Sequence, residues 1–237
     1  MKFMKMHGVS CLAALGLAVG LTAALAAAGS AQSVSGRAYG AYVNTPIASL
    51  EQSPLAVLPY VAPSDGGMAT ASADALSAGG GALSSEFLNS TTSGAIGATV
   101  TTAQSTATVA DISILSGLIT AQEVIAVVAS GRDGTSAWSN STGSTFENLV
   151  VNGVAVTTGD AAVAPNTRIS LPGVGYVVLN EVSRTGDGVS SSGITVNMIH
   201  VVLQTVTGGE CTLLGCTPGV LTTTGDIIVG SASSRVN

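Results

Sequence analysis

Short segments in which apolar and polar residues alternate run along most of the chain. They are separated by breaks rich in Gly, Asp and Asn, residues that accept the positive φ of tight turns. The segments cover residues 33–43, 68–76, 82–92, 98–114, 145–156, 167–173, 175–184, 194–206 and 226–234. Because no helical stretch separates them, the pattern predicts an all-β fold: an antiparallel β-sandwich or a barrel-like single domain.

Two further segments need separate interpretation. Residues 54–63, PLAVLPYVAP, are bracketed by prolines, which predicts an edge strand or a loop rather than a central strand. The apolar residues of 112–130 are compatible with strands and also with the apolar stripe of a helix. Their β-branched residues and Gly117 favour two strands with a turn near Ser116 and Gly117.

The first 31 residues have the layout of a secretory signal peptide. Lys2 and Lys5 precede an apolar stretch at 12–28, and the small residues of AAAGSAQS follow. We expect cleavage after Ala31, with Ala28 as the alternative, and a single all-β domain over 32–237. A retained membrane anchor is the competing interpretation of the same stretch, and cleavage would leave no membrane span in the mature chain.

Charge is scarce in this chain. Charged residues make up 8% of the sequence, and the loss of Lys2 and Lys5 with the leader changes the formal charge from −6 to −8. The remaining chain contains arginine but no lysine. Such a surface repels the phosphates of nucleic acid, and the lack of lysine excludes a lysine Schiff base and a P-loop.

Two cysteines remain once Cys11 leaves with the signal peptide. Cys211 and Cys216 enclose four residues in CTLLGC. An even pair in an exported chain predicts a disulfide that pins a local turn. A redox pair or half of a metal site is the alternative, although the spacing is not C-x-x-C.

His200, in ITVNMIHVVL, is the histidine that remains after cleavage. Strict alternation places it on one strand face with Ile194, Val196, Met198 and Val202. The functional interpretation is that His200 acts as a general base oriented by Glu181. The chain has no G-x-S-x-G elbow and no further histidine for a zinc site, so we predict a hydrogen-bonded structural histidine and no catalytic set.

Several aspartates lie beside glycine in predicted turns. Calcium binding is one interpretation, but EF-hand and nonapeptide spacings are absent and turn chemistry explains the pattern. We therefore expect no metal ion and no cofactor. The residues are Asp65, Asp133, Asp160, Asp187 and Asp226.

Five segments follow one another between about 110 and 234: ADISILSGLITAQEVIAVVAS, FENLVVNGVAV, APNTRISLPGVGYVVLNEV, ITVNMIHVVL and GDIIVGSAS. Taken in this order, they resemble the choice-of-anchor P family of secreted bacterial proteins. The resemblance implies an exported β domain rich in Gly, Ala and Val. The chain ends in GSASSRVN, which departs from the C-terminal attachment signals of anchored members.

Together these features predict a secreted or cell-surface protein of structural or adhesion type, which associates with itself or with an envelope component and is not an enzyme. Two alternatives stay open. One is an envelope module that binds a ligand or calcium. The other, ranked last, is a hydrolase that uses His200 and Glu181.

Overall fold

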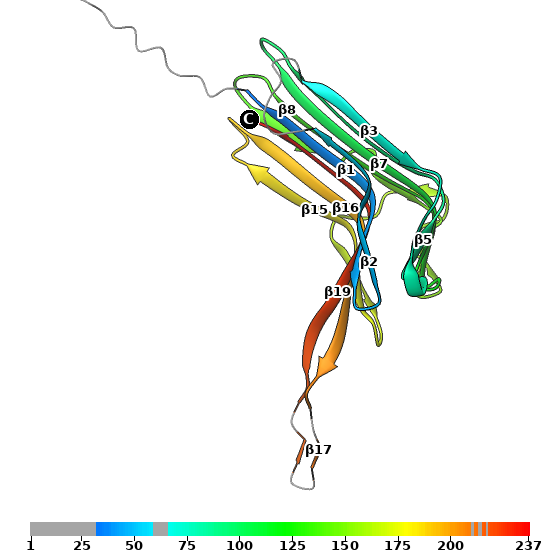
Figure 1. The fold of residues 1–237 in the computed structure, drawn as a ribbon. Coiled ribbons are helices and arrows are strands. Elements are labelled where there is room, and N and C mark those ends of the chain that lie inside the picture. Colours follow the sequence, from blue (N-terminus) through cyan, green and yellow to red (C-terminus); the bar gives the residue numbers. More distant parts are fainter. Residues whose placement is uncertain (1–31, 59–65, 210, 213–214, 217) are drawn as a thin grey trace, which may run out of the picture. The chain divides into compact units, whose positions relative to one another are not determined.

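Two large antiparallel β-sheets form the fold (Figure 1). The computed structural model describes residues 32–58, 66–209, 211–212, 215–216 and 218–237, so the predicted signal peptide lies outside the described residues. The prediction of an all-β, sandwich-like fold is confirmed. Among the described residues, no helix is long and apolar enough to cross a membrane.

The first sheet has six strands in the order β14-β15-β16-β19-β1-β2. Both chain ends meet in it, because Val34 lies opposite Val236 in the β1–β19 ladder. The strands are β1 (Val34–Thr45), β2 (Ala48–Leu58), β14 (Thr167–Leu171), β15 (Gly175–Gly186), β16 (Ser192–Thr207) and β19 (Val220–Val236).

The second sheet has eleven strands, centred on the long pair β7 and β8. Its strands are β3 (Gly67–Ala73), β4 (Leu76–Ala78), β5 (Leu83–Ser85), β6 (Leu88–Ile96), β7 (Thr101–Ile114), β8 (Ile119–Arg132), β9 (Ala137–Asn140), β10 (Thr145–Glu147), β11 (Val150–Val151), β12 (Val154–Ala155) and β13 (Asp160–Ala161). A short 3₁₀ turn, η1 (Gly79–Gly81), joins β4 to β5, and β17 (Cys211–Thr212) pairs with β18 (Gly215–Cys216).

The core lies between the facing sheets. Its largest fully buried side chains come from both sheets and include Phe146, Leu149, Met198, Ile199 and Ile227. Burial of each large apolar side chain contributes about 1.5–3 kcal/mol, which makes this interface the main source of stability. The outward positions carry Ser, Thr and other polar residues, as the alternating pattern predicts.

Segment 112–130 and the described part of segment 54–63 behave as the sequence predicts. In the stretch 112–130, β7 ends at Ile114, a turn covers 115–118, and β8 begins at Ile119. The proline-bracketed segment contributes its first residues to β2, which is an edge strand of the six-stranded sheet. The rest of that segment, 59–63, lies outside the described residues.

A crease crosses the six-stranded sheet. Five adjacent strands skip one ladder pair at the same level, at Gly40, Pro54, Asn180, Met198 and Gly230. Asn180 and Gly230 have φ of 48° and 66°, a left-handed backbone that interrupts the pleat. Along one strand, the inward-facing residues that flank the crease are therefore three sequence positions apart instead of two.

The β16–β19 hairpin continues beyond the rest of the sheet, as Figure 1 shows. The ladder extends from Gln204 opposite Thr223 to Thr207 opposite Val220. We call residues 204–207 and 220–223 the arm. The β15 ladder ends opposite Leu203 and the β1 ladder ends opposite Asp226. The Gln204 N–H still donates to the Val174 carbonyl over 2.8 Å; past that bond, within the described residues, the arm strands pair only with each other.

Candidate functional site

Glu181 and His200 lie side by side on the outer face of the six-stranded sheet. The Glu181 Oε2 atom is 2.9 Å from the His200 Nδ1 atom. Strand β15 supplies the carboxylate and β16 the imidazole, which is opposite Val178 in the ladder. Both side chains are partly exposed, so this is a surface cluster and not a buried one.

The crease explains why these two side chains meet. Met198 and Ile199 are adjacent in sequence and both are fully buried, which strict alternation does not allow. The prediction that His200 shares a face with Ile194, Val196 and Met198 is therefore wrong. Past Met198 the alternation is inverted, and His200 emerges on the same outer face as Asn197.

A hydrogen-bond chain extends from Glu181 across the sheet. The Asn197 amide donates to Glu181 Oε2 over 2.7 Å, and the Ser231 hydroxyl donates to Asn197 Oδ1 over 2.8 Å. Tyr39, opposite Ser231 on β1, is hydrogen-bonded to the Ser231 side chain. Burial raises the Tyr39 pKa despite that bond. The chain joins four adjacent strands, which indicates that it ties the sheet together.

The charges in this cluster stabilise each other. The hydrogen bond to Glu181 raises the pKa of His200, and the hydrogen bond from His200 lowers the pKa of Glu181. Burial opposes both shifts. The His200 Nε2 atom also lies 3.9 Å from Asp226 Oδ2. An imidazole between two carboxylates favours the protonated, cationic form.

The surroundings of His200 can be compared with those of a catalytic histidine. A histidine that activates a serine has one ring nitrogen on the hydroxyl and the other on an orienting carboxylate. Here Nδ1 contacts Glu181 and Nε2 faces Asp226, while the Ser231 hydroxyl donates to Asn197. Glu181 and His200 converge as a hydrolase would require, but the neighbouring hydroxyl is not directed at the imidazole.

The aspartates beside glycine fall into different places. Asp133 accepts hydrogen bonds from the backbone N–H groups of Thr135 and Ser136, and these bonds lower its pKa to about 2. Asp187 accepts from three backbone N–H groups in the loop that follows β15. Hydrogen bonds, led by that of the Ser190 hydroxyl, lower its pKa even further. Both carboxylates organise their own turns.

The other three aspartates beside glycine are placed differently from Asp133 and Asp187. Asp160 lies in the short strand β13, and Asp65 is outside the described residues. The prediction of a turn is wrong for Asp160, which begins β13, and for Asp226, which is within β19 beside His200. Among the described residues, no group of three or more His, Cys, Asp and Glu side chains is arranged to hold a metal ion.

Cys211 and Cys216 lie directly opposite each other in the two-residue ladder of β17 and β18. Their side chains lie outside the described part of the structure. Residues opposite each other on antiparallel strands have Cα atoms about 4.5–5.5 Å apart, which is within the range of disulfides. The backbone register is therefore compatible with the predicted bond, which stays a prediction.

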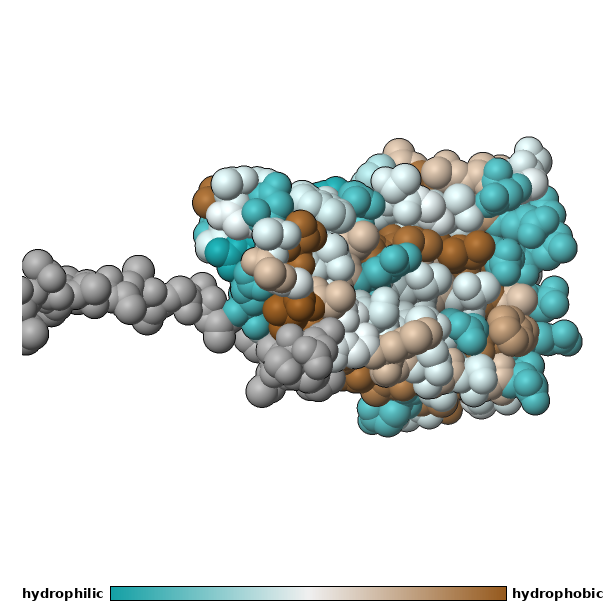
Figure 2. Space-filling model, turned by 90° about the horizontal axis from the view of Figure 1, so that it is seen from above, coloured by the Kyte–Doolittle hydropathy of each residue, from teal (hydrophilic) through white to brown (hydrophobic). Residues whose placement is uncertain are grey.

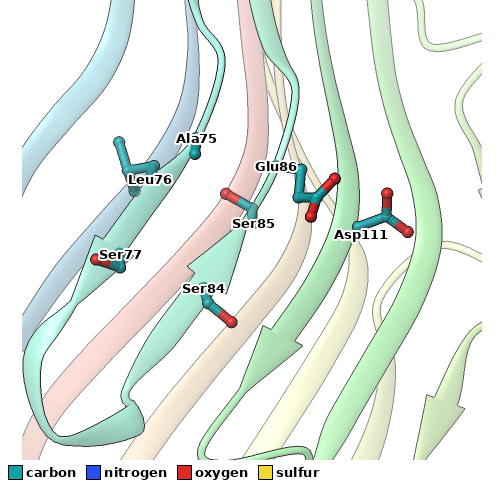
Figure 3. Close-up of a pocket in the computed structure, with 7 residues that line it drawn as sticks. All are labelled: Ala75, Leu76, Ser77, Ser84, Ser85, Glu86 and Asp111. Carbon is teal, nitrogen blue, oxygen red and sulfur yellow. The ribbon is translucent and has the colours of Figure 1, made fainter.

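The sequence did not point to a hollow of about 410 Å³ near the edge of the second sheet (Figure 3). Glu86 and Asp111 line it with Ser84 and Ser85. Asp111 has φ of 51° and lies where the β7–β8 ladder skips a pair. The Ser85 hydroxyl is buried. Two carboxylates are fewer than the six to eight oxygen ligands that calcium takes, so these two side chains do not by themselves make a calcium site.

Comparison of the chain with known protein families, with curated proteins and with solved structures finds no match. The resemblance to the choice-of-anchor P family thus stays a prediction. The class of protein that the fold supports is an antiparallel β-sandwich, and any function has to be argued from the surfaces described above.

Proposed function

We propose that this is an exported β-sandwich protein that works by association, with copies of itself or with envelope material, and not by turnover of a substrate. The observation that carries the proposal is the arm. Beyond Gln204, the outer edges of its two strands have no backbone partner in the described part of the chain, and an exposed strand edge is a ready template for pairing with another chain.

The side chains of the arm favour association. Val206 lies directly opposite Leu221, and these two residues are 63% and 64% exposed. On the other face, the Thr207 and Thr222 hydroxyls are 2.8 Å apart. Glu210 is the single charged residue in the sequence between Leu203 and Asp226. Proteins commonly protect free edges with lysine, and the chain beyond the predicted leader has none.

The face of the molecule seen in Figure 2 is consistent with this proposal. Figure 2 shows one face of the molecule, where pale atoms of intermediate hydropathy predominate and teal and brown patches lie between them. Small uncharged side chains lose little conformational entropy when they become ordered. Contacts between such surfaces depend on packing and backbone hydrogen bonds more than on ion pairs.

The geometry around His200 supports the part of the proposal that excludes turnover. Its two ring nitrogens face Glu181 and Asp226, so the imidazole has a stabilising role within the sheet. Export and a surface location rest on the predicted signal peptide, on the cysteine pair and on the family resemblance.

Sedimentation velocity over a concentration series tests the proposal. We expect oligomers to increase with concentration and to change little in moderate salt, because few ion pairs take part. The variant Leu221→Lys places a charge on the arm and should shift the distribution towards monomer. Val189→Lys is the matched control, because Val189 is 61% exposed but lies in the loop that follows β15.

Binding to isolated envelope is measured in parallel by co-sedimentation. A wild-type protein that stays monomeric at every concentration and binds no envelope material would contradict the proposal. Equal oligomerisation of wild type and Leu221→Lys would show that the arm is not the contact. Turnover of an ester, peptide or glycan by the purified protein would overturn the non-enzymatic assignment.

A further inference from the structure

A second hollow, of about 430 Å³, lies where the arm leaves the sheet. The β14–β15 hairpin contributes Arg168, Ser170 and Tyr176, and the start of the arm contributes Gln204 and Thr205. The volume is within the range of small-molecule sites, roughly 300–1,000 Å³. None of these residues belongs to the Glu181–His200 cluster, and no motif in the sequence singles them out.

Arg168 supplies a positive charge to the lining of this hollow. Its guanidinium carbon lies 3.6 Å from the centroid of the Tyr176 ring. Stacking on an aromatic ring restricts the orientation of this exposed guanidinium and leaves the N–H groups at the edge of its plane available to a ligand. Among the residues that the structure describes, the Arg168 side chain has no carboxylate partner and no hydrogen-bond acceptor.

A fixed guanidinium fork is matched to a planar carboxylate, which it binds through two parallel hydrogen bonds. In a chain whose formal charge beyond the leader is −8, such a group is a local exception to the prevailing negative charge. The hollow is therefore electrostatically suited to a ligand that carries one negative charge rather than to a cation.

The other lining groups narrow the ligand class. The Ser170 and Thr205 hydroxyls and the Gln204 amide offer both donors and acceptors, which suit a ligand with several hydroxyl groups. Val206 and Leu221 complete the lining with apolar surface. A pyranose ring has polar edges and apolar C–H faces, so it can use both kinds of surface at once.

We propose that this hollow binds a sugar carboxylate of the uronic acid type. Arg168 pairs with the carboxylate, Tyr176 positions Arg168, and Ser170, Gln204 and Thr205 bind the ring hydroxyls. The binding site is complete within one chain, and it shares the apolar residues Val206 and Leu221 with the arm.

Titration of the ¹⁵N-labelled protein with D-glucuronate, followed by NMR and isothermal titration calorimetry, tests the proposal. The amide signals of Gly173, Gly175, Gln204 and Thr205 should shift together. D-Glucose lacks the carboxylate and acetate lacks the ring, so each should bind roughly tenfold more weakly or worse. Inorganic phosphate distinguishes a sugar-acid site from a general oxyanion site.

Arg168→Gln should abolish glucuronate binding, and Arg168→Lys should weaken it roughly tenfold because a lysine lacks the planar fork. Tyr176→Phe retains the ring and should retain binding. The matched control is Arg184→Gln, since Arg184 is another exposed arginine of the same sheet whose guanidinium donates to the Ser139 carbonyl over 2.6 Å. Thermal unfolding of each variant verifies that it is folded.

Three outcomes would overturn the inference: no shift with glucuronate at millimolar concentration, equal binding of glucose, or unchanged binding by folded Arg168→Gln. Binding of acetate or phosphate as tight as that of glucuronate would overturn the sugar assignment. Sedimentation of the same samples separates this result from the proposed function, because loss of ligand binding leaves the oligomers of Arg168→Gln unchanged.

Discussion

Glu181 and His200 are joined by a hydrogen bond of 2.9 Å between Oε2 and Nδ1, across adjacent strands of one sheet. The two side chains do not occupy a directly opposed ladder pair, because Glu181 lies opposite Asn197 and His200 lies opposite Val178. Their contact depends on the crease between these two ladder levels. The pair is therefore a sensitive reporter of the native sheet.

The first prediction concerns the pH dependence of stability. The pKa of His200 is raised in the folded protein, so its contribution is present below the ordinary value of 6.5 and is lost as the pH rises through the folded pKa. The pKa of Glu181 is lowered, so its contribution is present above the ordinary value of 4.5 and is lost as the pH falls through the folded pKa. The contribution of the pair is therefore greatest between pH 4.5 and pH 6.5.

Urea unfolding of wild type and His200→Gln over a pH series measures this contribution. We expect a difference in the free energy of unfolding of about 1 kcal/mol near the middle of that window, with smaller values at higher and lower pH. Glu51→Gln serves as the control, because Glu51 is exposed on β2 and has no ion pair in the described structure. A difference that does not vary with pH would contradict the assigned ion pair.

The second prediction concerns the crease. A Cβ atom on Gly230 would lie 3.0 Å from Val124 Cγ1 in the facing sheet, at a backbone φ of 66°. Gly230→Ala combines left-handed strain with overpacking and should lower the free energy of unfolding by about 2–4 kcal/mol. Gly134 has φ of 90° but nothing within 4 Å of its Cβ position. Gly134→Ala should therefore cost about 1–2 kcal/mol, the strain alone.

Chemical denaturation of both glycine variants compares these costs directly. Equal destabilisation would mean that the contact with Val124 is relieved at no cost in free energy. The close approach of the two sheets would then not require a glycine at position 230.

The third prediction concerns the two aspartate turns. Hydrogen bonds lower the pKa of both carboxyl groups from the ordinary value of 3.8, that of Asp133 to about 2. Carboxyl ¹³C NMR should therefore show both groups still ionised at pH 3. The stabilisation of each turn is present above pH 3.8 and is lost as the pH falls through the folded pKa.

Asp187→Ala should remove the acceptor for the N–H groups of Val189, Ser190 and Ser191 and speed the hydrogen exchange of these three amides. The control is Asp160→Ala, which should leave them unchanged. Unaltered exchange in Asp187→Ala would show that the loop is held by other contacts.

The fourth prediction concerns the cysteines. A Cys211–Cys216 bond should lower the intact mass of the exported protein by two hydrogens relative to the reduced form. Reduction should affect only the β17–β18 turn, because a loop this small gives modest stabilisation. Two thiols that react with an alkylating reagent in native, unreduced protein would refute the bond.

Much of the fold was predictable because β-strand patterns are local. The alternation with period two, the turn at 115–118 and the edge position of the segment after Pro54 all depend on neighbouring residues. The hollow lined by Arg168 and Tyr176 was not predictable, because its walls come from β14, β15 and the arm, which the sequence does not show to be adjacent.

By itself, the sequence determined the class of the fold and the scarcity of charged residues along the chain. Only the tertiary structure decided which way His200 faces and what it contacts. The reason is the crease: the left-handed backbone at Asn180 and Gly230 inverts the alternation on adjacent strands together. A glycine or asparagine in a sequence permits that conformation, but the packing of one sheet on the other selects it.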